Sequence, residues 1–338
     1  MKGVTIYTIA KELNMTPSMV SRALNPNGRV DEAKRRLVLE TAERYNFKPN
    51  RLASRLSGKE IKIGILINYS FEPVLKKMIS GIERAYSECK DYKISYKVIT
   101  VKSCDKRAWE CEEELFSLCE CDGAIITGFG SEKCTDMLKR FVNINPNLVQ
   151  MQSINENADC LFVSRHDEKI AASLAADFLN SCLKRSDKRV VLFTGNRINF
   201  LHRSASEAFS ASCREYGLNL IETVDMRDSD EELSAALPEL FERHGNRIDG
   251  IYITSANSLS LCKFVKSNSL PTVIVGFDTY DKLNEYIKDG TVSMTISQNI
   301  KEQARVAFKT LVEYLVDGKK PEKTVFTAIR PIFKSILK

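Results

Sequence analysis

Two different hydrophobic patterns divide the chain near residue 60. Before it, apolar residues recur every three or four positions over short stretches, as in amphipathic helices. After it, runs of consecutive apolar residues alternate with amphipathic stretches, which is typical of parallel strands separated by helices. Strands are predicted at residues 61–67, 92–101, 122–127, 147–152, 189–194, 248–254, 272–277 and 292–296. Helices are predicted at residues 73–89, 105–119, 132–143, 168–183, 201–216, 230–244, 258–267 and 300–317.

The alternating part predicts an α/β architecture with parallel, doubly wound sheets. It comprises 278 of the 338 residues, which is more than one such sheet usually holds. Two similar lobes are therefore expected. Ligands of open α/β sheets bind at the carboxyl ends of the strands, so a ligand site is expected between the lobes.

Residues 1–49 predict a small all-α unit whose first two helices form a helix-turn-helix. The first helix runs from about Ile6 to Leu13. The second has Thr16 as its N-cap, Pro17 as its first helical residue, and an end near Asn25. Because so few residues separate the two helices, they must cross steeply, which leaves the second free to enter a DNA major groove.

Asp31 is the predicted N-cap of a third helix, and each helix has a predicted inward face. These faces consist of Ile6, Ile9, Ala10 and Leu13 in the first helix, Val20, Ala23 and Leu24 in the second, and Ala33, Leu37, Thr41 and Tyr45 in the third.

The net charge of the protein is concentrated in its N-terminal part. Residues 1–60 contain 12 Lys+Arg and 6 Asp+Glu, whereas the whole chain has 50 and 44, so the remainder holds 38 of each. The formal net charge of +6 therefore belongs to the first 60 residues. A basic module on a neutral body is typical of nucleic-acid binding, and a solubilising basic arm is the alternative.

The composition predicts a cytoplasmic globular protein. No apolar run approaches the roughly 20 residues that a membrane helix needs, and the N-terminus has no secretory apolar core. The ten cysteines form no paired motif, and the three histidines are far apart in sequence. Free, buried thiols are therefore expected rather than disulfides or a metal centre.

Three N-terminal segments carry a resemblance to a known family. They are VTIYTIAKEL at 4–13, SMVSRALN at 18–25 and KPNRLA at 48–53. Over residues 4–58, nearly without gaps, they resemble the headpiece of the LacI/GalR family of bacterial repressors. The resemblance implies a DNA-binding headpiece at 1–49, a hinge helix or linker at 50–60, and a two-lobed effector-binding and dimerisation domain at 61–338.

The resemblance also implies which headpiece residues contact DNA. Pro17, Ser18 and Arg22 would read bases, and the forked guanidinium of Arg22 matches guanine O6 and N7. Thr5, Ser21 and Asn25 would contact phosphates, with helix capping and turn formation as the alternative for Ser21 and Asn25. The further implied contacts are Tyr7, Arg29, Asn50, Ala53 and Leu56.

Residues 50–58 resemble the hinge of the family. Leu52, Ala53 and Leu56 form an apolar stripe on barely two helical turns, too few for a stable isolated helix. Such a segment would become ordered with a partner helix and DNA, so it is a natural switch. In the family, the hinge leucine, here Leu56, is wedged into the minor groove and kinks the duplex. A plain linker is the alternative.

Four short motifs extend the resemblance over residues 61–333. They are DGAII at 122–126, DGIY at 249–252, VGFD at 275–278 and TISQ at 295–298, and they resemble the effector domain of the family, which is similar to periplasmic sugar-binding proteins. The resemblance places Phe71, Asn257 and Asp278 at the cleft, with Gln298 near the lobe crossover. Arg203 is a further candidate for effector binding, although it need not point into the cleft. For Asp278, capping a helix that starts near Tyr280 is the alternative.

One departure bears on the ligand. Family members usually carry an effector-gripping arginine within Arg-x-x-Gly-Phe, but here Ala205 and Ala208 stand at the Arg and Gly positions before Phe209. Arg203 is two residues away from the family position. This departure argues against a simple sugar as the ligand, and it leaves open a protein without a small-molecule effector.

The predicted function is that of a sequence-specific transcriptional regulator. We expect a homodimeric repressor of near-palindromic operator DNA, modulated by a small, sugar-like molecule, without contact with a membrane. A corepressor-dependent repressor or an activator, with an altered or absent effector site, is the alternative. An enzyme is disfavoured because the Gly128-Phe129-Gly130 stretch has Lys133 where a dinucleotide fingerprint needs its third glycine. A free solute-binding protein would lack the basic headpiece. No cofactor is expected.

Overall fold

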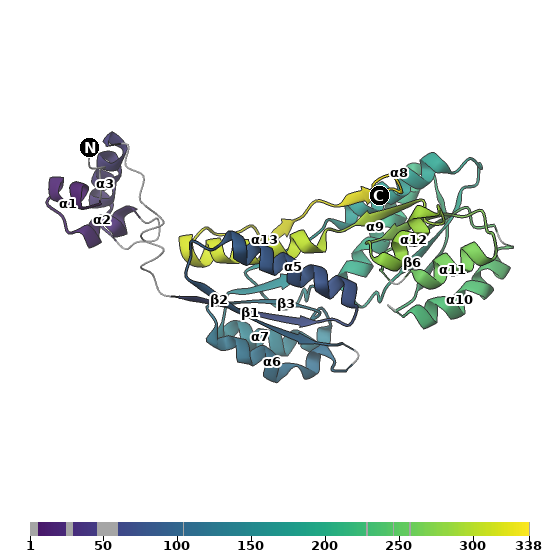
Figure 1. The fold of residues 1–338 in the computed structure, drawn as a ribbon, viewed down its shortest axis with the longest axis horizontal. Coiled ribbons are helices and arrows are strands. Elements are labelled where there is room, and N and C mark those ends of the chain that lie inside the picture. The colour runs from purple at the N-terminus through teal and green to yellow at the C-terminus, as the bar shows by residue number, and fades with distance from the viewer. Residues whose placement is uncertain are drawn as a thin grey trace.

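The computed structural model describes residues 6–24, 30–45, 60–103, 105–227, 229–245, 247–256 and 258–337. Within them lie three N-terminal helices and two α/β lobes (Figure 1). We call the lobe that contains β1 the N-lobe and the lobe that contains β6 the C-lobe. No described helix combines the length and the apolar character that crossing a membrane requires.

The three N-terminal helices are α1 (Ile6–Glu12), α2 (Pro17–Leu24) and α3 (Glu32–Arg44). Their predicted starts are confirmed. The Thr16 hydroxyl accepts a hydrogen bond from Met19 N–H at 3.2 Å, and the Asp31 carboxylate accepts from Ala33 N–H and Lys34 N–H.

The predicted inward face of α3 is wrong in part. Leu37 and Tyr45 are 45% and 40% exposed, and Ala33 is also exposed. Thr41 is buried as predicted. Val38 and Ala42 are buried in place of the other three residues, because they pack against the buried residues of α1 and α2. The predicted inward positions Ile9, Ala10, Val20 and Ala23 are confirmed as buried.

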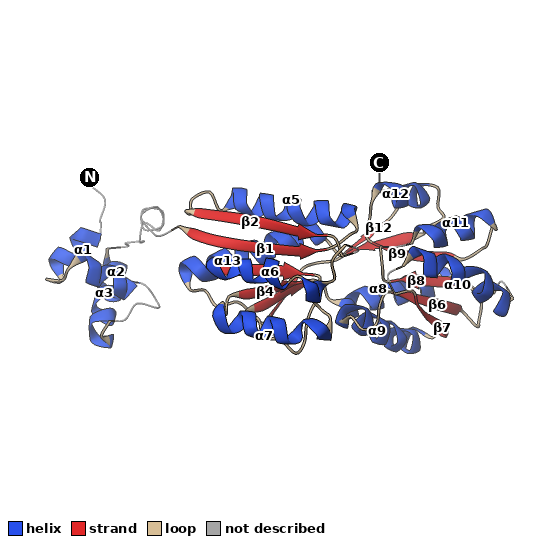
Figure 2. Cartoon of the chain, turned by 90° about the horizontal axis from the view of Figure 1, so that it is seen from below, coloured by secondary structure: helices blue, strands red, loops and turns tan. Residues whose placement is uncertain are grey.

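The N-lobe is a parallel sheet between two layers of helices (Figure 2). Its strand order is β11-β5-β4-β3-β1-β2. Its strands are β1 (Ile61–Asn68), β2 (Ile94–Val101), β3 (Gly123–Thr127), β4 (Leu148–Met151), β5 (Phe162–Arg165) and β11 (Thr324–Phe326). Its helices are α5 (Glu72–Glu88), η1 (Ala108–Glu110), α6 (Glu112–Phe116), η2 (Ser117–Glu120), η3 (Glu132–Cys134), α7 (Thr135–Ile144) and α13 (Ile300–Asp317).

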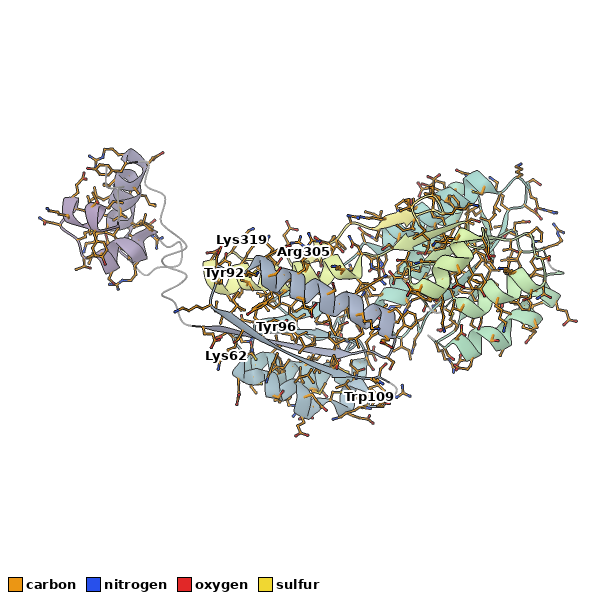
Figure 3. The ribbon with its side chains drawn as sticks, in the orientation of Figure 1. Lys62, Tyr92, Tyr96, Trp109, Arg305 and Lys319 are labelled. Carbon is orange, nitrogen blue, oxygen red and sulfur yellow. The ribbon has the colours of Figure 1, made fainter. Side chains whose placement is uncertain are left out.

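Helices α5 and α13 lie side by side on one face of this sheet, although they are far apart in sequence (Figure 1). Tyr96 of β2 packs edge-on against Phe308 of α13 at 5.8 Å between ring centroids. Arg305 of α13 donates to Glu88 of α5 at 2.6 Å (Figure 3). The last helix of the N-lobe is thereby tied to its first.

The C-lobe has the same plan, with strand order β12-β10-β9-β8-β6-β7 and an antiparallel edge strand β12. Its strands are β6 (Arg189–Thr194), β7 (Asn219–Asp225), β8 (Gly250–Ile253), β9 (Val273–Phe277), β10 (Met294–Ser297) and β12 (Arg330–Ile332). Its helices are α8 (Glu168–Cys182), α9 (Phe200–Tyr216), α10 (Asp230–Arg243), α11 (Leu259–Ser267) and α12 (Asp281–Lys288).

The chain crosses between the lobes three times. The crossovers join β5 to α8, β10 to α13, and β11 to β12. The sequence-based expectation of two doubly wound lobes is confirmed. The strand pattern missed β5, β7, β11 and β12, and the helix predicted at 105–119 is divided into η1, α6 and η2.

Candidate nucleic-acid interface and inter-lobe site

The exposed side of α2 carries the predicted base-reading residues. Ser18 and Arg22 are exposed and Pro17 is half-buried. The Arg22 Nε–H donates to the Ser18 carbonyl at 3.3 Å, which holds the start of the guanidinium against the helix. Helix α2 starts at Pro17, and Thr16 is its N-cap. The first turn of α2 therefore comes directly after the short turn that follows α1.

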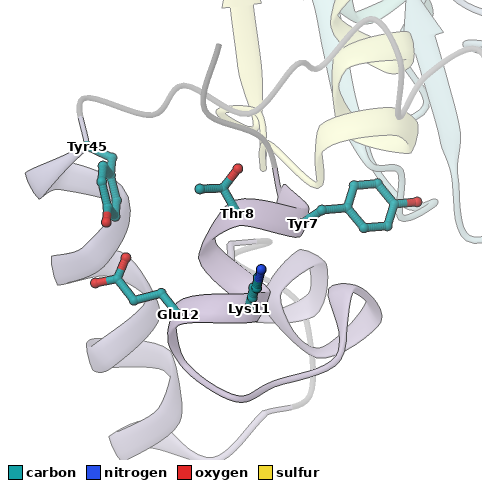
Figure 4. Close-up of a pocket in the computed structure, with 5 residues that line it drawn as sticks. All are labelled: Tyr7, Thr8, Lys11, Glu12 and Tyr45. Carbon is teal, nitrogen blue, oxygen red and sulfur yellow. The ribbon is translucent and has the colours of Figure 1, made fainter. Parts of the chain in front are cut away.

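A shallow, open depression lies between α1 and the end of α3, lined by Tyr7, Thr8, Lys11, Glu12 and Tyr45 (Figure 4). Tyr7 is 74% exposed, and its ring points away from the depression (Figure 4). Glu12 is paired with Arg44 at 3.0 Å. A hydrogen bond to Glu12 raises the pKa of Tyr45. The carboxylate of Glu12 is therefore held by Arg44 and Tyr45, which also belong to the N-terminal helices.

Several predicted site residues lie outside the described residues. They are Thr5, Asn25, Arg29, Asn50, Ala53, Leu56 and Asn257. Ser21 is within α2, and its backbone alone is described.

Asp278 lies in the turn after β9, between the lobes, and is 2% exposed. Its Oδ2 accepts a hydrogen bond from Gln298 Nε2 at 2.6 Å, and its Oδ1 accepts from Gln298 N–H at 3.4 Å. Burial raises the pKa of Asp278, and the Gln298 hydrogen bonds oppose this. The capping alternative is wrong, because α12 begins at Asp281 after the N-cap Tyr280, which has no side-chain capping bond.

Gln298 lies on the crossover from β10 to α13 and contacts both lobes. Its Oε1 accepts a hydrogen bond from Gln152 Nε2 at 3.0 Å, and Gln152 follows β4 of the N-lobe. The Gln298 carbonyl accepts from Gln303 Nε2 at 2.7 Å. One partly buried chain of hydrogen bonds therefore joins Gln152, Gln298 and Asp278 across the lobes.

Two further contacts bridge the lobes beside this chain. The ring of Phe71, just before α5, meets the ring of Tyr280 edge-on at 5.1 Å between centroids. Lys77 of α5 donates to the Thr279 hydroxyl at 3.2 Å and to its carbonyl. The start of α5 is thereby held against the turn between β9 and α12.

A third bridge joins the loop between β4 and β5 to α9. Arg203 Nη2 donates to Glu156 Oε2 at 2.5 Å, and both side chains are partly exposed. Ala205, at the position where the family usually has its arginine, is 7% exposed on the same helix. Arg203 therefore points to a carboxylate of the other lobe.

The first crossover carries a buried charged cluster that the sequence pattern did not reveal. Arg165 pairs with Glu168 at 2.5 Å, and its guanidinium lies 5.1 Å from the Phe200 ring and 5.2 Å from the Phe326 ring. Burial lowers the pKa of His166 to about 4, and burial raises the pKa of Glu168 to about 7. The signal available in the sequence was the run Arg-His-Asp-Glu directly after the apolar residues of β5.

Comparison with known proteins supports the architecture. Residues 119–320 match the periplasmic binding protein domain family. The periplasmic ribose ABC transporter structure from Conexibacter woesei superposes with a TM-score of 0.73 at 18% identity, over 83% of this chain and 94% of that one. A putative LacI transcriptional regulator from Bacteroides fragilis superposes with a TM-score of 0.68 at 18% identity, over 82% and 98%. At these identities the superpositions show the fold alone.

Sequence relatives are regulators. Catabolite control protein B of Bacillus subtilis is 38% identical over 81 residues, which are 24% of this chain and 26% of that protein. The match therefore spans about a quarter of the length of that relative. Catabolite control protein A of Staphylococcus aureus is 23% identical over 256 residues, 75% of this chain and 74% of that protein.

The two lobes and the domain match define a protein of the periplasmic-binding-protein fold, and the chain belongs to that domain family. Its N-terminal motifs at 4–13, 18–25 and 48–53 resemble the headpiece of the LacI/GalR family.

Proposed function

We propose that the protein is a sequence-specific transcriptional repressor that binds near-palindromic double-stranded operator DNA as a homodimer in the cytoplasm. In this proposal, residues 1–49 form the helix-turn-helix headpiece, residues 50–60 form the hinge, and residues 61–338 bind the effector and dimerise. The headpiece contacts are those given above for residues 5–56, with Arg22 as the main base-reading side chain.

The observation that carries the proposal is the placement of Arg22. It is exposed on α2, the second helix of the helix-turn-helix, in a part of the chain that holds the whole net charge of +6. Positive charge attracts the phosphate backbone, and an arginine on a groove-entering helix supplies base selection. The regulator relatives support the same function.

The proposed effector is a carbohydrate bound between the lobes by Phe71, Arg203, Asn257, Asp278 and Gln298. Proteins of similar fold include a ribose transporter component and binding proteins solved with D-arabinose. Buried carboxylate and amide groups are suited to sugar hydroxyls. A corepressor-dependent repressor or an activator with an altered effector site is the second candidate, favoured by the internal contacts of Phe71, Arg203, Asp278 and Gln298.

Selection of bound sequences from a random double-stranded DNA library tests the proposal directly. The full-length protein should enrich one near-palindromic motif, with half-sites separated as two headpieces of a dimer require. Enrichment without any motif would show that the headpiece binds DNA only through its charge. Sedimentation of the protein with the selected duplex should give two chains per duplex, and one chain per duplex would contradict the dimer.

A further inference from the structure

The four described residues proposed to bind an effector are all engaged by other side chains of the protein. Phe71 packs on Tyr280, Arg203 pairs with Glu156, and Asp278 and Gln298 bond to one another. The first two contacts cross from one lobe to the other, and Gln298 extends the third to Gln152 of the N-lobe. The lobes are therefore bridged at both flanks and at the crossover by the chain itself.

The contact between Gln298 and Asp278 has the chemistry of a bound ligand. The carboxylate of Asp278 is buried, and both of its acceptor atoms are met by N–H groups of Gln298. The other end of the same amide accepts from Gln152. A primary amide thus offers one donor to the C-lobe and one acceptor to the N-lobe. Two neighbouring hydroxyls of a sugar offer the same pair, because each hydroxyl both donates and accepts.

We propose that the Gln298 side chain is an internal occupant of the effector position, which a polyhydroxylated ligand must displace from Asp278 in order to bind. The inference rests on the proposed function, since it describes how the same inter-lobe site is regulated. It explains how the lobes are bridged without the usual arginine, whose position is held by Ala205.

Displacement of Gln298 has a consequence for the whole molecule. Gln298 lies on the crossover before α13, and its carbonyl is held by Gln303 in that helix. When a ligand replaces the amide, the hydrogen bond from Gln152 is lost or passes to the ligand. The effector therefore acts on lobes that are already bridged, in contrast to a ligand that draws two separated lobes together.

Isothermal titration of the full-length protein with D-ribose, D-galactose and D-arabinose tests the inference. Gln298→Leu removes the amide, so this variant should bind at least one of these sugars at least 10-fold more tightly than the wild type. Gln298→Asn, whose shorter side chain cannot reach both partners, should also bind more tightly and serves as a second variant if the leucine variant folds poorly.

Gln150→Leu is the matched control. Gln150 is buried, and its amide is bonded at both ends to residues of its own lobe, among them Asn155 and Ala158. This variant should bind sugars as the wild type does. Gln298→Leu and Gln152→Leu should each speed amide hydrogen exchange at residues 71–78 and 279–284, where the flanking bridge lies, whereas Gln150→Leu should not.

Three results would overturn the inference: equal or weaker sugar binding by both Gln298 variants, no binding of the three sugars by any variant, or unchanged exchange at both segments in Gln298→Leu. Weaker binding would make Gln298 a ligand contact. Failure of the proposed function is distinguishable, because a protein that selects no DNA motif would still give these sugar and exchange results.

Discussion

The headpiece and the lobes are stabilised by very different amounts of buried surface. The headpiece has one cluster of six buried apolar residues, namely Ile9, Ala10, Val20, Ala23, Val38 and Ala42. Each lobe has buried clusters on both faces of its sheet. The headpiece and the hinge together hold the entire net charge, whereas the lobes are neutral. A small unit with a small core and a large charge, carried by a separate, larger scaffold, is suited to binding DNA.

Buried polar side chains are concentrated in the lobes and are scarce in the described headpiece. The described headpiece buries one polar side chain, that of Thr41. The described lobes bury many polar residues. Among them, His166, Glu168 and Asp278 lie at the first crossover or in the turn after β9, and Gln303 lies in the first turns of α13. Burial of unpaired polar groups is costly, and here the carboxylates of Asp278 and Glu168 are paired with Gln298 and Arg165. The proposed function therefore has its DNA contacts in the headpiece, and the contacts between the lobes lie at the crossovers.

The largest expected effect comes from breaking the small core. Ile9→Ala should cost about 2–5 kcal/mol, which is comparable to the whole stability that so small a core supplies, about 3–5 kcal/mol. Operator binding should therefore be lost, while the unfolding transition of the lobes, followed by circular dichroism, stays where it is. Leu261→Ala, in the C-lobe core, is the control, and it should shift the lobe transition and spare DNA binding. A shift of both transitions by either variant would contradict independent units.

The second-largest expected effect is that of salt concentration, which should change DNA binding by the headpiece far more than sugar binding by the lobes. Because the headpiece charge acts on phosphates, operator affinity should fall about 10³–10⁵-fold between about 50 and about 200 mM salt if about 6–10 phosphates are contacted. Sugar binding by the neutral lobes should change little. Fluorescence anisotropy with a labelled duplex measures the first, and titration calorimetry measures the second. An operator affinity that is independent of salt would rule out phosphate binding by the headpiece.

The pH dependence of unfolding should depend on the lobes, since all three histidines lie in them. The pKa of His166 is lowered from 6.5 to about 4 in the folded chain. Between these two pH values the imidazole is therefore protonated in the unfolded chain and neutral in the folded chain. The free energy of unfolding should fall as the pH drops through this interval, by up to about 3 kcal/mol. The pKa of Glu168 is raised from 4.5 to about 7 in the folded chain. Between these two pH values the carboxyl group is therefore protonated in the folded chain and ionised in the unfolded chain. This contribution lowers the free energy of unfolding as the pH rises.

The two contributions oppose one another between pH 4.5 and 6.5. Glu168→Gln should therefore reveal the histidine contribution, with urea unfolding at pH 4.5 requiring less denaturant than at pH 6.5. His166→Asn should reverse the slope. Parallel pH profiles for the wild type and both variants would show that neither group changes its proton affinity on folding.

The smallest expected effect is on base selection. Arg22→Ala should cost about 1–3 kcal/mol on the selected operator and much less on random duplex, because the lost contact is to a base. Arg36→Ala removes the same charge from the exposed side of α3 and is the control. Its loss should be equal on both duplexes. Equal losses for Arg22→Ala would make Arg22 a phosphate contact.

Local signals predicted most of the elements correctly. Thr16 with Pro17 and Asp31 begin their helices as predicted, because capping bonds form between residues three or fewer apart. The central strands were recognised because strands buried on both faces are continuous apolar runs. The edge strand β7 has mixed polarity, and β11 and β12 have three residues each, so their pairing with neighbours rather than their own composition makes them strands.

The two-part organisation, the alternation of strands and helices, and the concentration of charge could all be predicted from local sequence, because each depends on residues close together in the chain. The partner that each polar residue meets could not, because it depends on tertiary packing. Arg203 meets Glu156 across 47 positions, and Gln298 meets Gln152 across 146. Such pairings depend on how two sheets and three crossovers are packed, and no local pattern of hydrophobic and polar residues encodes the distance between side chains on separate lobes.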